Sequence, residues 1–415
     1  MTAPFQSQLW DTYVFQLAER YEFITSALVA LSSVHETFSC GVENRTRSQA
    51  DVLRYYTKTI RGINQSMDAE LSIDAVLMTI LILHTLDSMR SYFQNALQHA
   101  QAGIKIIRER LSMFHASGQT LWSEAMHREF LAMQNQVREF GNSGVSKAFD
   151  ALQGFEPPSC DQFNSVEEAL YHLGIVFNEM YCLSDYLEVL QSSKIVLSDV
   201  FVRKIQPRYK TVILRFKSWK RGLQHLNTLL SSDYDHRQSQ ACLVLSMYES
   251  LFNAMLESFP SGICFDRFDA DLSRALDLAH MFIERQASSS TSHTDFSLSL
   301  GIIPGLFVIA WRSNDNFIRD KSLELLRRSD RREGVWDSKV AFQIVQRYIA
   351  LKTASIADTP GGHVQISEIF FDSDTTCQLV CCVIGSEIPL SGELLPFEGL
   401  LGERRCVETI QLGLD

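Results

Sequence analysis

Nine cysteines and eleven histidines are the residues of this 415-residue chain best suited to building a metal or nucleophilic site. The one cysteine cluster is Cys377-x-x-x-Cys381-Cys382, which lies in an apolar run and contains no Cys-x-x-Cys pair. A structural zinc site needs thiolates or imidazoles at short, regular spacings. Dispersed cysteines in apolar surroundings are more typical of small buried thiols. The cysteines therefore predict no metal site.

The histidines and acidic residues offer three weaker candidates. His84 lies in an apolar helical pattern and His99 lies on the next, so the two could face each other; a shared metal is one interpretation, and hydrogen-bonded core histidines are the ordinary one. His35 is followed by Glu36 but lacks the second histidine of a zinc-protease helix. The acidic segment 372–374 resembles the start of a calcium loop without its later Gly and Glu. None of the three predicts a site.

No catalytic motif is present in the sequence. It contains no glycine-rich dinucleotide loop, no phosphate-binding loop ending in Lys-Ser/Thr, and no Gly-x-Ser-x-Gly nucleophile elbow. The sequence therefore predicts that the protein is not an enzyme, with no catalytic residues, no metal and no cofactor, and it leaves open which residues would hold a ligand.

Charge argues against direct DNA binding. The chain has 38 basic and 49 acidic side chains, a formal net charge of −11, whereas a domain that binds duplex DNA alone concentrates positive charge. The one strongly basic stretch, 203–221, holds eight Lys and Arg residues. Val212, Phe216 and Trp219 recur through it at helical spacing, which predicts an amphipathic helix with a solvated basic face. Contact with a nucleic acid or an acidic partner is the alternative.

The composition is typical of a globular protein in a reducing compartment. Hydrophobic residues make up 46% and charged residues 21% of the chain. Neither a signal peptide nor an apolar run of the ~20 residues needed to span a bilayer is visible. Nine cysteines without a pairing pattern fit a reducing environment. We expect a soluble intracellular protein with no membrane contact.

Apolar residues recur every three to four positions, which predicts an all-α protein. We expect segments 72–88 and 90–111 to form an antiparallel pair, with inner faces that meet through Val76, Ile80, Leu83, Leu97, Ile104 and Ile107. No constant repeat of 34 residues is present, so an irregular multi-helix bundle or imperfect solenoid fits better than a true repeat array. Before residue 300 the predicted helices are 9–19, 21–38, 47–66, 72–88, 90–111, 120–140, 165–191, 208–230, 237–257 and 270–286.

The helical pattern continues to residue 352, which predicts one large helical domain over 1–352. Internal loops are expected near 141–164, where Gly and Pro cluster, and near 287–296, which is rich in serine. Residues 353–415 are expected to form a poorly specified C-terminal extension, partly irregular or β, with β-prone pieces at 364–371 and 379–385.

Residues 301–352 contain an ordered series of motifs. Ile-Pro at 303–304 precedes an apolar helix ending in Ala-Trp-Arg, and a second helix ends in Leu-Leu-Arg-Arg. Arg-Arg-Glu-Gly-Val-Trp-Asp follows at 331–337, and then one more helix. This order closely resembles the C-terminal signature of the regulatory region of fungal Zn(2)-Cys(6) transcription factors. We expect the charged segment 327–332 to be an inter-helix loop; a nuclear import signal is the weaker alternative.

Three N-terminal segments resemble the same family. Residues 27–36 match its Ala-Leu-x-Ala-Leu-Ser-x-x-His element, residues 55–60 its Tyr-Tyr helix start, and residues 92–107 its Ala-Leu-x-His-x-x-x-Gly element. The resemblance thus spans residues ~10–352. The family's DNA-binding element, six cysteines within roughly thirty residues, is missing from this sequence.

The resemblance implies a nuclear regulator of transcription that acts through protein partners, as a homodimer or a heteromer with a related factor, or through a small-molecule effector. Specific DNA binding and stoichiometric zinc are not expected of this chain alone. Truncation, a gene-model error and a paralogue without the cluster would each explain the missing cysteines. A helical scaffold or adaptor unrelated to transcription is the alternative function.

Overall fold

The structure is a computed structural model that is predominantly helical, as the sequence predicts. Within its described part, no helix is long and apolar enough to cross a bilayer. The described residues are 5, 9–40, 45–66, 72–114, 124–140, 161–192, 205–230, 236–259, 265, 267–288, 295–358, 363–384 and 404–412.

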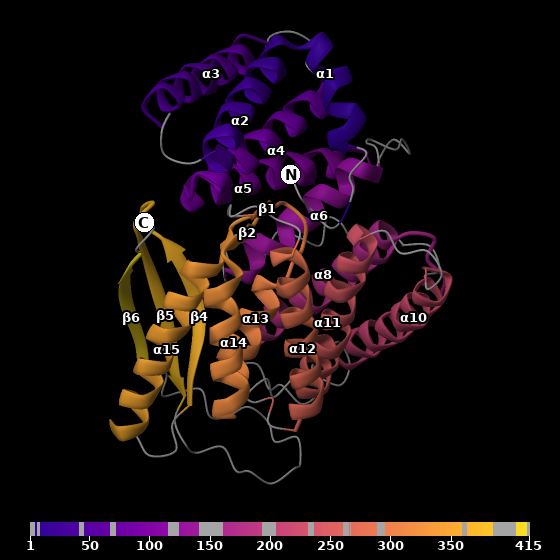
Figure 1. The fold of residues 1–415 in the computed structure, drawn as a ribbon, viewed down its shortest axis with the longest axis vertical. Coiled ribbons are helices and arrows are strands. Elements are labelled where there is room, and N and C mark those ends of the chain that lie inside the picture. Colours follow the sequence, from indigo (N-terminus) through magenta and orange to yellow (C-terminus); the bar gives the residue numbers. More distant parts are fainter. Residues whose placement is uncertain are drawn as a thin grey trace.

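The N-terminal helices gather at one end of the molecule (Figure 1). A π-helical turn, η1 (Leu9–Tyr13), leads into α1 (Val14–Arg20), and α2 packs against both α3 and α4. The helices that follow α1 are α2 (Glu22–Cys40), α3 (Arg45–Ser66), α4 (Ile73–Met89), α5 (Phe93–Phe114) and α6 (Glu124–Glu139).

Helices α4 and α5 form the predicted antiparallel pair. Helix α4 is apolar almost all round and is buried over most of its length, as expected for a central helix. Gly103 on α5 allows close packing, because a Cβ there would lie only 3.0 Å from Cγ2 of Ile80 and 2.5 Å from the ring of Phe130. Of the six predicted contact residues, Val76 is partly buried and the others are buried: Ile80, Leu83, Leu97, Ile104 and Ile107.

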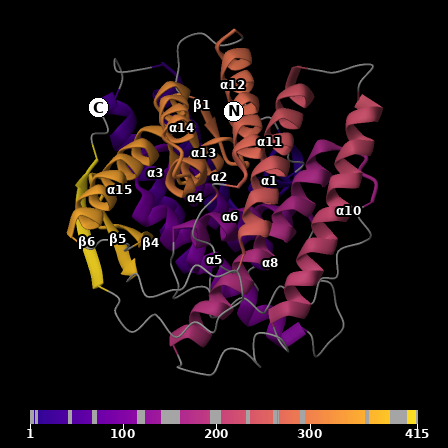
Figure 2. The same ribbon diagram turned by 90° about the horizontal axis from the view of Figure 1, so that it is seen from below.

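The remaining helices form a second group, which lies below the first in the view of Figure 1 and in front of it in the view from below of Figure 2. Helix α8 packs against α10, α11 against α12, and α13 against both α14 and α15. The bounds are α8 (Val166–Ser192), α10 (Gln206–Leu230), α11 (His236–Ser258), α12 (Asp269–Ala287), α13 (Ile303–Arg312), α14 (Asn316–Ser329) and α15 (Ser338–Asp358).

The basic stretch 203–221 lies largely in α10 and is amphipathic, as predicted. Val212, Phe216 and Trp219 are buried, and the Trp219 indole N–H donates to the Ala169 carbonyl at 2.8 Å. Several of its cations lie against acids of this same chain, in the pairs Arg215–Glu179 (3.0 Å), Lys220–Glu249 (3.5 Å) and Arg221–Asp161 (3.1 Å).

Two small sheets complete the fold. In the first, β1 (Asp295–Ser297) pairs in parallel with β2 (Arg331–Glu333), and β2 pairs antiparallel with β3 (Trp336–Asp337). Strand β1 begins inside the predicted loop 287–296, and residues 141–160 of the other predicted loop lie outside the described residues. The division at residue 352 stays a prediction, although α15 continues through it to Asp358.

The second sheet is an antiparallel meander of β4 (His363–Phe371), β5 (Thr376–Ile384) and β6 (Arg404–Gln411). It packs on the helices: the Phe371 ring lies 4.9 Å from that of Phe93 and 5.4 Å from that of Phe140. The Tyr348 hydroxyl of α15 donates to the Val364 carbonyl at 2.7 Å. Strands β4 and β5 occupy the two β-prone pieces, whereas β6 was not expected.

Candidate functional site

The segment 331–337, called the 331–337 turn below, is a tight hairpin in which Gly334 and Val335 connect β2 to β3. Gly334 occupies its left-handed position at φ +60°, a conformation that favours glycine. Its N–H donates to the Ser297 carbonyl at 2.7 Å, which ties the turn to β1. A Cβ at this position would lie 2.1 Å from Oε1 of Gln136 on α6. Backbone conformation and close packing therefore both explain the glycine of the motif.

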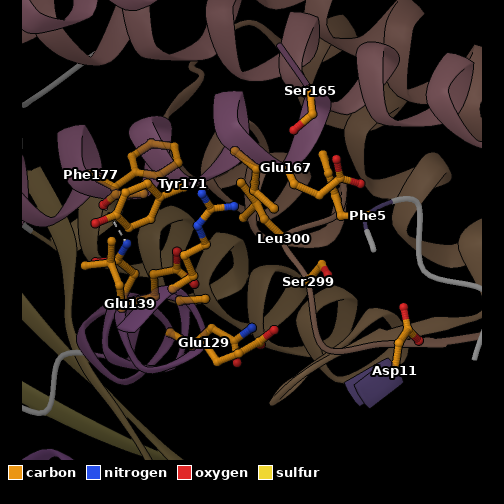
Figure 3. A pocket seen from close by; sticks show the side chains of 17 residues that line it. Phe5, Asp11, Glu129, Glu139, Ser165, Glu167, Tyr171, Phe177, Ser299 and Leu300 are labelled. Carbon is orange, nitrogen blue, oxygen red and sulfur yellow. Dashed lines mark hydrogen bonds between the residues drawn. The ribbon is translucent and has the colours of Figure 1, made fainter. Parts of the chain in front are cut away.

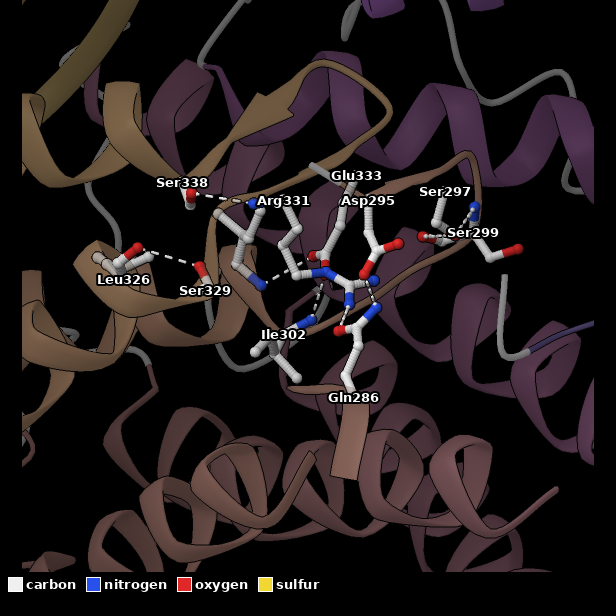
Figure 4. A network of polar contacts seen from close by, with 11 residues as sticks. Gln286, Asp295, Ser297, Ser299, Ile302, Leu326, Ser329, Arg331, Glu333 and Ser338 are labelled. Carbon is white, nitrogen blue, oxygen red and sulfur yellow. Dashed lines mark hydrogen bonds and ion pairs between the residues drawn. The ribbon is translucent and has the colours of Figure 1, made fainter. Parts of the chain in front are cut away.

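Arg331 and Glu333 form a fully buried ion pair (Figure 4). The two residues alternate with Arg332 along β2 and so point to the same side. Arg331 Nε lies 2.6 Å from Glu333 Oε1, and each side chain is only 1% exposed. Arg331 also donates through Nη1 to Oε1 of Gln286 at 2.5 Å and lies over the Phe282 ring at 4.8 Å. The pair thus ties β2 to the end of α12.

Glu333 also caps α13. Its Oε1 and Oε2 accept the N–H groups of Ile302 and Ile303 at 2.9 and 2.8 Å. These N–H groups have no partner within the helix, and a carboxylate at a helix N-terminus is favourable. A Cβ on Gly301 would lie 1.9 Å from Glu333 Oε1, so only glycine leaves room for the cap. The Gly-Ile-Ile-Pro and Arg-Arg-Glu motifs therefore belong to one structural unit.

Arg332 joins the turn to the N-terminal helices. Its Nε lies 2.7 Å from Oδ2 of Asp337, and its Nη1 donates to the Met89 carbonyl at the end of α4 at 2.5 Å. Asp337 in turn accepts the N–H groups of Lys339 and Val340 at 2.9 and 3.2 Å, which caps α15. One ion pair thus links helices that are more than 240 residues apart in sequence.

Trp336 joins the turn to α6. Its indole N–H donates to Oε2 of Glu139 at 2.6 Å, and its ring lies 4.5 Å from that of Phe140 and 4.9 Å from that of Phe307. Oε1 of Glu139 accepts the Tyr181 hydroxyl of α8 at 3.1 Å. Burial raises the pKa of Glu139 to about 7, although the Trp336 and Tyr181 hydrogen bonds lower it; the nearby charge of Glu333 raises it further.

Glu139→Gln is expected to change how stability depends on pH. The folded pKa lies above the ordinary value of 4.5, so the protonated Glu139 contributes stability that is complete below about pH 4.5 and is lost as pH rises through about 7. The glutamine amide is uncharged and can still accept from Trp336. We expect the variant to melt close to the wild-type temperature near pH 5 and several degrees higher near pH 8. Melting curves at both pH values test this, with exposed Glu324→Gln as the control that shows no pH-dependent difference.

The prediction of a charged inter-helix loop at 327–332 is wrong. Residues up to Ser329 belong to α14, and the segment from Arg331 forms β2. Arg331 is buried by its pair with Glu333, and the Arg332 side chain is only 17% exposed. An import receptor would need accessible basic side chains, which Arg331 and Arg332 do not provide, whereas Arg327 and Arg328 at the end of α14 are exposed.

A pocket of about 460 Å³ adjoins this network (Figure 3). It lies between α6 and α8, and the segment just before α13 and part of the N-terminal segment complete its wall. Glu139 and Gln136, which contact the 331–337 turn, also line it. Its other lining residues are Phe5, Asp11, Arg128, Glu129, Leu131, Ala132, Asn135, Ser165, Glu167, Leu170, Tyr171, Gly174, Phe177, Ser299 and Leu300.

Comparison with known families finds a match for the N-terminal third of the chain. Residues 1–133 match the fungal specific transcription factor domain. The matched part includes α1 to α5 and the first half of α6. It therefore includes the pair α4 and α5, whose Met89 carbonyl accepts from Arg332. This match confirms the resemblance to fungal transcription factors found in the sequence.

A curated fungal transcription factor is similar over a longer stretch. It is the aspercryptin biosynthesis cluster-specific transcription regulator atnN of Emericella nidulans, 22% identical over 413 aligned positions. The similar stretch covers 77% of this chain and 66% of that protein, so the chain spans about two thirds of its relative's length. No solved structure matches the chain. The matched family and this relative are both transcription regulators and not enzymes, which supports a role in transcription regulation.

Within residues 1–133, His84 and His99 lie on the neighbouring helices α4 and α5 and form hydrogen bonds to protein groups. The His84 ring nitrogen Nδ1 is hydrogen-bonded to the Ala96 carbonyl at 2.9 Å, and burial lowers the pKa of His84 to about 4. His99 Nε2 lies 2.8 Å from the Tyr56 hydroxyl and 3.3 Å from Oδ2 of Asp87. Tyr56 and His99 come from two of the family elements seen in the sequence, which this contact brings together.

The cysteine cluster and the 372–374 segment, where the structure describes them, belong to β5 and to the turn that precedes it. Cys377 and Cys381 are buried on one face of β5, and their separation of four residues along a strand corresponds to ~13 Å. Burial also raises the pKa of Cys377 to about 12. The 372–374 segment is the β4–β5 turn, where the Asp372 N–H donates to the Thr376 carbonyl at 3.1 Å. No group of three or more metal-ligand side chains occurs in the part of the chain that the structure describes.

Sequence reasoning found the 331–337 motif but missed its partners. Glu139 and Gln136 sit in an ordinary amphipathic helix, and no local pattern marks either one. No sequence pattern marks the pocket residues either, because they come from four segments separated by long stretches of chain. The density of polar residues through the second half of α6 was the available signal, since Gln134, Asn135, Gln136 and Arg138 are all buried.

Proposed function

We propose that this chain is a transcription regulator of the fungal Zn(2)-Cys(6) type, whose helical region acts in the nucleus through protein partners or a small-molecule effector. The observation that carries the proposal is the match of residues 1–133 to the fungal specific transcription factor domain. The similarity to a regulator specific to one biosynthesis cluster suggests that the targets are the genes of a single biosynthetic cluster.

The geometry supports a regulatory body that works as a unit. The 331–337 segment contacts Met89 of α4, Gln136 and Glu139 of α6, and Gln286 of α12. A shift of any one of these helices would therefore disturb the hydrogen bonds that join the 331–337 segment to the others. Coupling of this kind suits a domain that relays a binding event to a partner.

DNA contact would be supplied by another protein segment or a second subunit. In a heteromer with a related factor that carries a zinc cluster, a subunit lacking that cluster would remove one of two half-site contacts. Overexpression of the chain should then lower the expression of genes that such a partner controls.

A reporter assay tests the proposal. The full chain, fused to a foreign DNA-binding domain, should accumulate in the nucleus and change reporter output by at least about threefold relative to that domain alone, which corresponds to an apparent free-energy change of at least about 0.65 kcal/mol. Deleting residues 301–351 is unsuitable as a control, because it removes α13, α14 and most of α15 from the core. The same fusion carrying Ile80→Asp should also be inactive, because α4 no longer packs. The control that keeps the fold is Leu53→Asp at an exposed position of α3, which should leave reporter output unchanged.

Unchanged reporter output from a folded, nuclear fusion, with no effect of overexpression on any promoter, would contradict the proposal. A helical scaffold outside transcription would then be the better interpretation.

A further inference from the structure

The pocket between α6 and α8 has an excess of negative charge. Among the described residues that line it are four carboxyl groups, those of Asp11, Glu129, Glu139 and Glu167, and one guanidinium, that of Arg128. They come from η1, α6 and α8, so they surround the cavity from different sides (Figure 3). In a partly desolvated cavity, a cation would gain more from these charges than it would in bulk water.

Asn135 supplies an independent indication of a ligand. Its side-chain Nδ2 donates to the Gly174 carbonyl at 2.9 Å, which fixes the orientation of the amide. The residue is only 6% exposed, and its Oδ1 has no hydrogen-bond partner among the described residues. A buried acceptor without a partner costs about 1–3 kcal/mol. Asn135 lines the pocket, so an N–H donor on a bound molecule that reached its buried Oδ1 would remove this cost.

The rest of the described wall is mostly apolar and aromatic, with Gln136, Ser165 and Ser299 as its further polar residues. Phe177 and Tyr171 on α8 and Leu131 on α6 are buried side chains that line the cavity, and Leu300 adds to the apolar surface. A volume of about 460 Å³ lies within the range of small-molecule sites, which combine an apolar wall with a few convergent polar groups.

We propose that this pocket binds a small organic ammonium compound: its charged nitrogen would lie among the pocket carboxylates and Asn135 Oδ1, and its apolar body would pack against Tyr171 and Phe177. Acceptor groups and negative charge dominate the polar lining, so a carboxylate or phosphate ligand is disfavoured. The cavity is large enough for a bicyclic ring with a short side chain.

The site would also be linked to the 331–337 turn. Glu139 faces the pocket and accepts the Trp336 N–H, and Ser299 and Leu300 immediately precede the Gly301 that contacts Glu333. A ligand ammonium beside Glu139 would hold that carboxylate in its charged form. That the ligand controls transcription rests on the proposed function; that it binds does not.

Calorimetric titration of the full chain tests the binding with three matched probes. Tryptamine, tryptophol and indole-3-acetate share an indole ring and carry a cationic, a neutral and an anionic group. We expect tryptamine to bind one-to-one with a dissociation constant below about 1 mM, at least about tenfold more tightly than tryptophol. Indole-3-acetate should bind most weakly.

Two pocket variants, with a surface variant as control, locate the binding site. Glu167→Gln removes one pocket carboxylate and should weaken tryptamine about tenfold, whereas Asp51→Asn, the same loss of charge on the exposed face of α3, should not. Ala132→Phe should abolish binding by filling the cavity. Circular dichroism and melting curves establish that each variant is folded.

Three results would each overturn the proposal: no binding of any probe at millimolar concentration, tryptophol or indole-3-acetate binding as tightly as tryptamine, or tryptamine binding that Glu167→Gln and Ala132→Phe leave unchanged. Binding of tryptamine with an inactive reporter fusion would instead support the pocket and count against the regulatory function. The two failures are therefore distinguishable.

Discussion

Glu333→Gln is expected to destabilise the protein by ~3–5 kcal/mol, the cost typical of removing one partner from a buried ion pair. The substitution keeps the shape of the side chain but leaves the charge of Arg331 uncompensated where both side chains are 1% exposed. It also replaces one of the two oxygens that accept the N–H groups of Ile302 and Ile303 with an N–H₂ donor. Urea unfolding followed by circular dichroism measures the effect.

The matched control is Glu324→Gln, because Glu324 also pairs with an arginine. Its partner Arg328 lies 3.7 Å away, but the Glu324 side chain is 57% exposed, so solvent screens the pair. We expect a change below ~1 kcal/mol. Equal effects of the two substitutions would show that the buried pair has no special part in the fold. A double variant, Arg331→Met with Glu333→Leu, should lower the free energy of unfolding by less than the sum of the two single substitutions, because neither charge is then left without its partner.

Ile80→Asp is expected to unfold the protein at room temperature. Ile80 is 8% exposed and packs across α5 at Gly103, where a Cβ would lie only 3.0 Å from its Cγ2. An aspartate there must lie unpaired among apolar groups or be protonated, and it also removes a branched core side chain. Together these effects cost several kcal/mol, a large part of the ~5–15 kcal/mol that stabilises a typical protein.

The same chemical change at an exposed position provides the control. Leu53 on α3 is 64% exposed, so Leu53→Asp removes little buried area and leaves the new carboxylate in water. The control variant should keep the wild-type far-ultraviolet circular dichroism spectrum, whereas Ile80→Asp should lose most of its helical signal. A cooperative, wild-type-like melting transition for Ile80→Asp would contradict the central position of α4.

The helices of the fold follow from local patterns. Apolar spacing placed α4 and α5 within a few residues of their observed ends, because each helix presents a continuous apolar face to the core. Predictions failed where pairing is non-local. Strand β1 is three residues long and pairs with β2 more than 30 residues later, so nothing in 295–297 itself indicates a strand.

The candidate site shows the same difference between local features, which the sequence predicts, and non-local contacts, which it does not. The 331–337 motif was recognisable because its residues are contiguous, but its charged residues predicted a solvated loop. Arg331 is buried instead because the Glu333 carboxylate compensates its charge, Gln286 accepts from its Nη1 and the Phe282 ring lies against its guanidinium. Its Nη2 has no hydrogen-bond partner among the described residues. No sequence rule predicts the two partners on α12, Gln286 and Phe282, because they lie more than 40 residues earlier in the chain. The pocket could not be predicted at all, since its shape depends on how α6 and α8 approach each other.

The long sequence separations within the 331–337 network bear on synthesis of the chain at the ribosome. Trp336 is 197 residues from Glu139, and Arg332 is 243 residues from the Met89 carbonyl. At about 5–20 residues per second, roughly 10–40 seconds pass between translation of α6 and that of its partner turn. During this interval Glu139, Gln136 and the Phe140 ring lack the contacts that bury them in the finished protein. Nascent chains stalled before residue 331 should therefore be preferred clients of ribosome-associated chaperones, and release should coincide with emergence of α15.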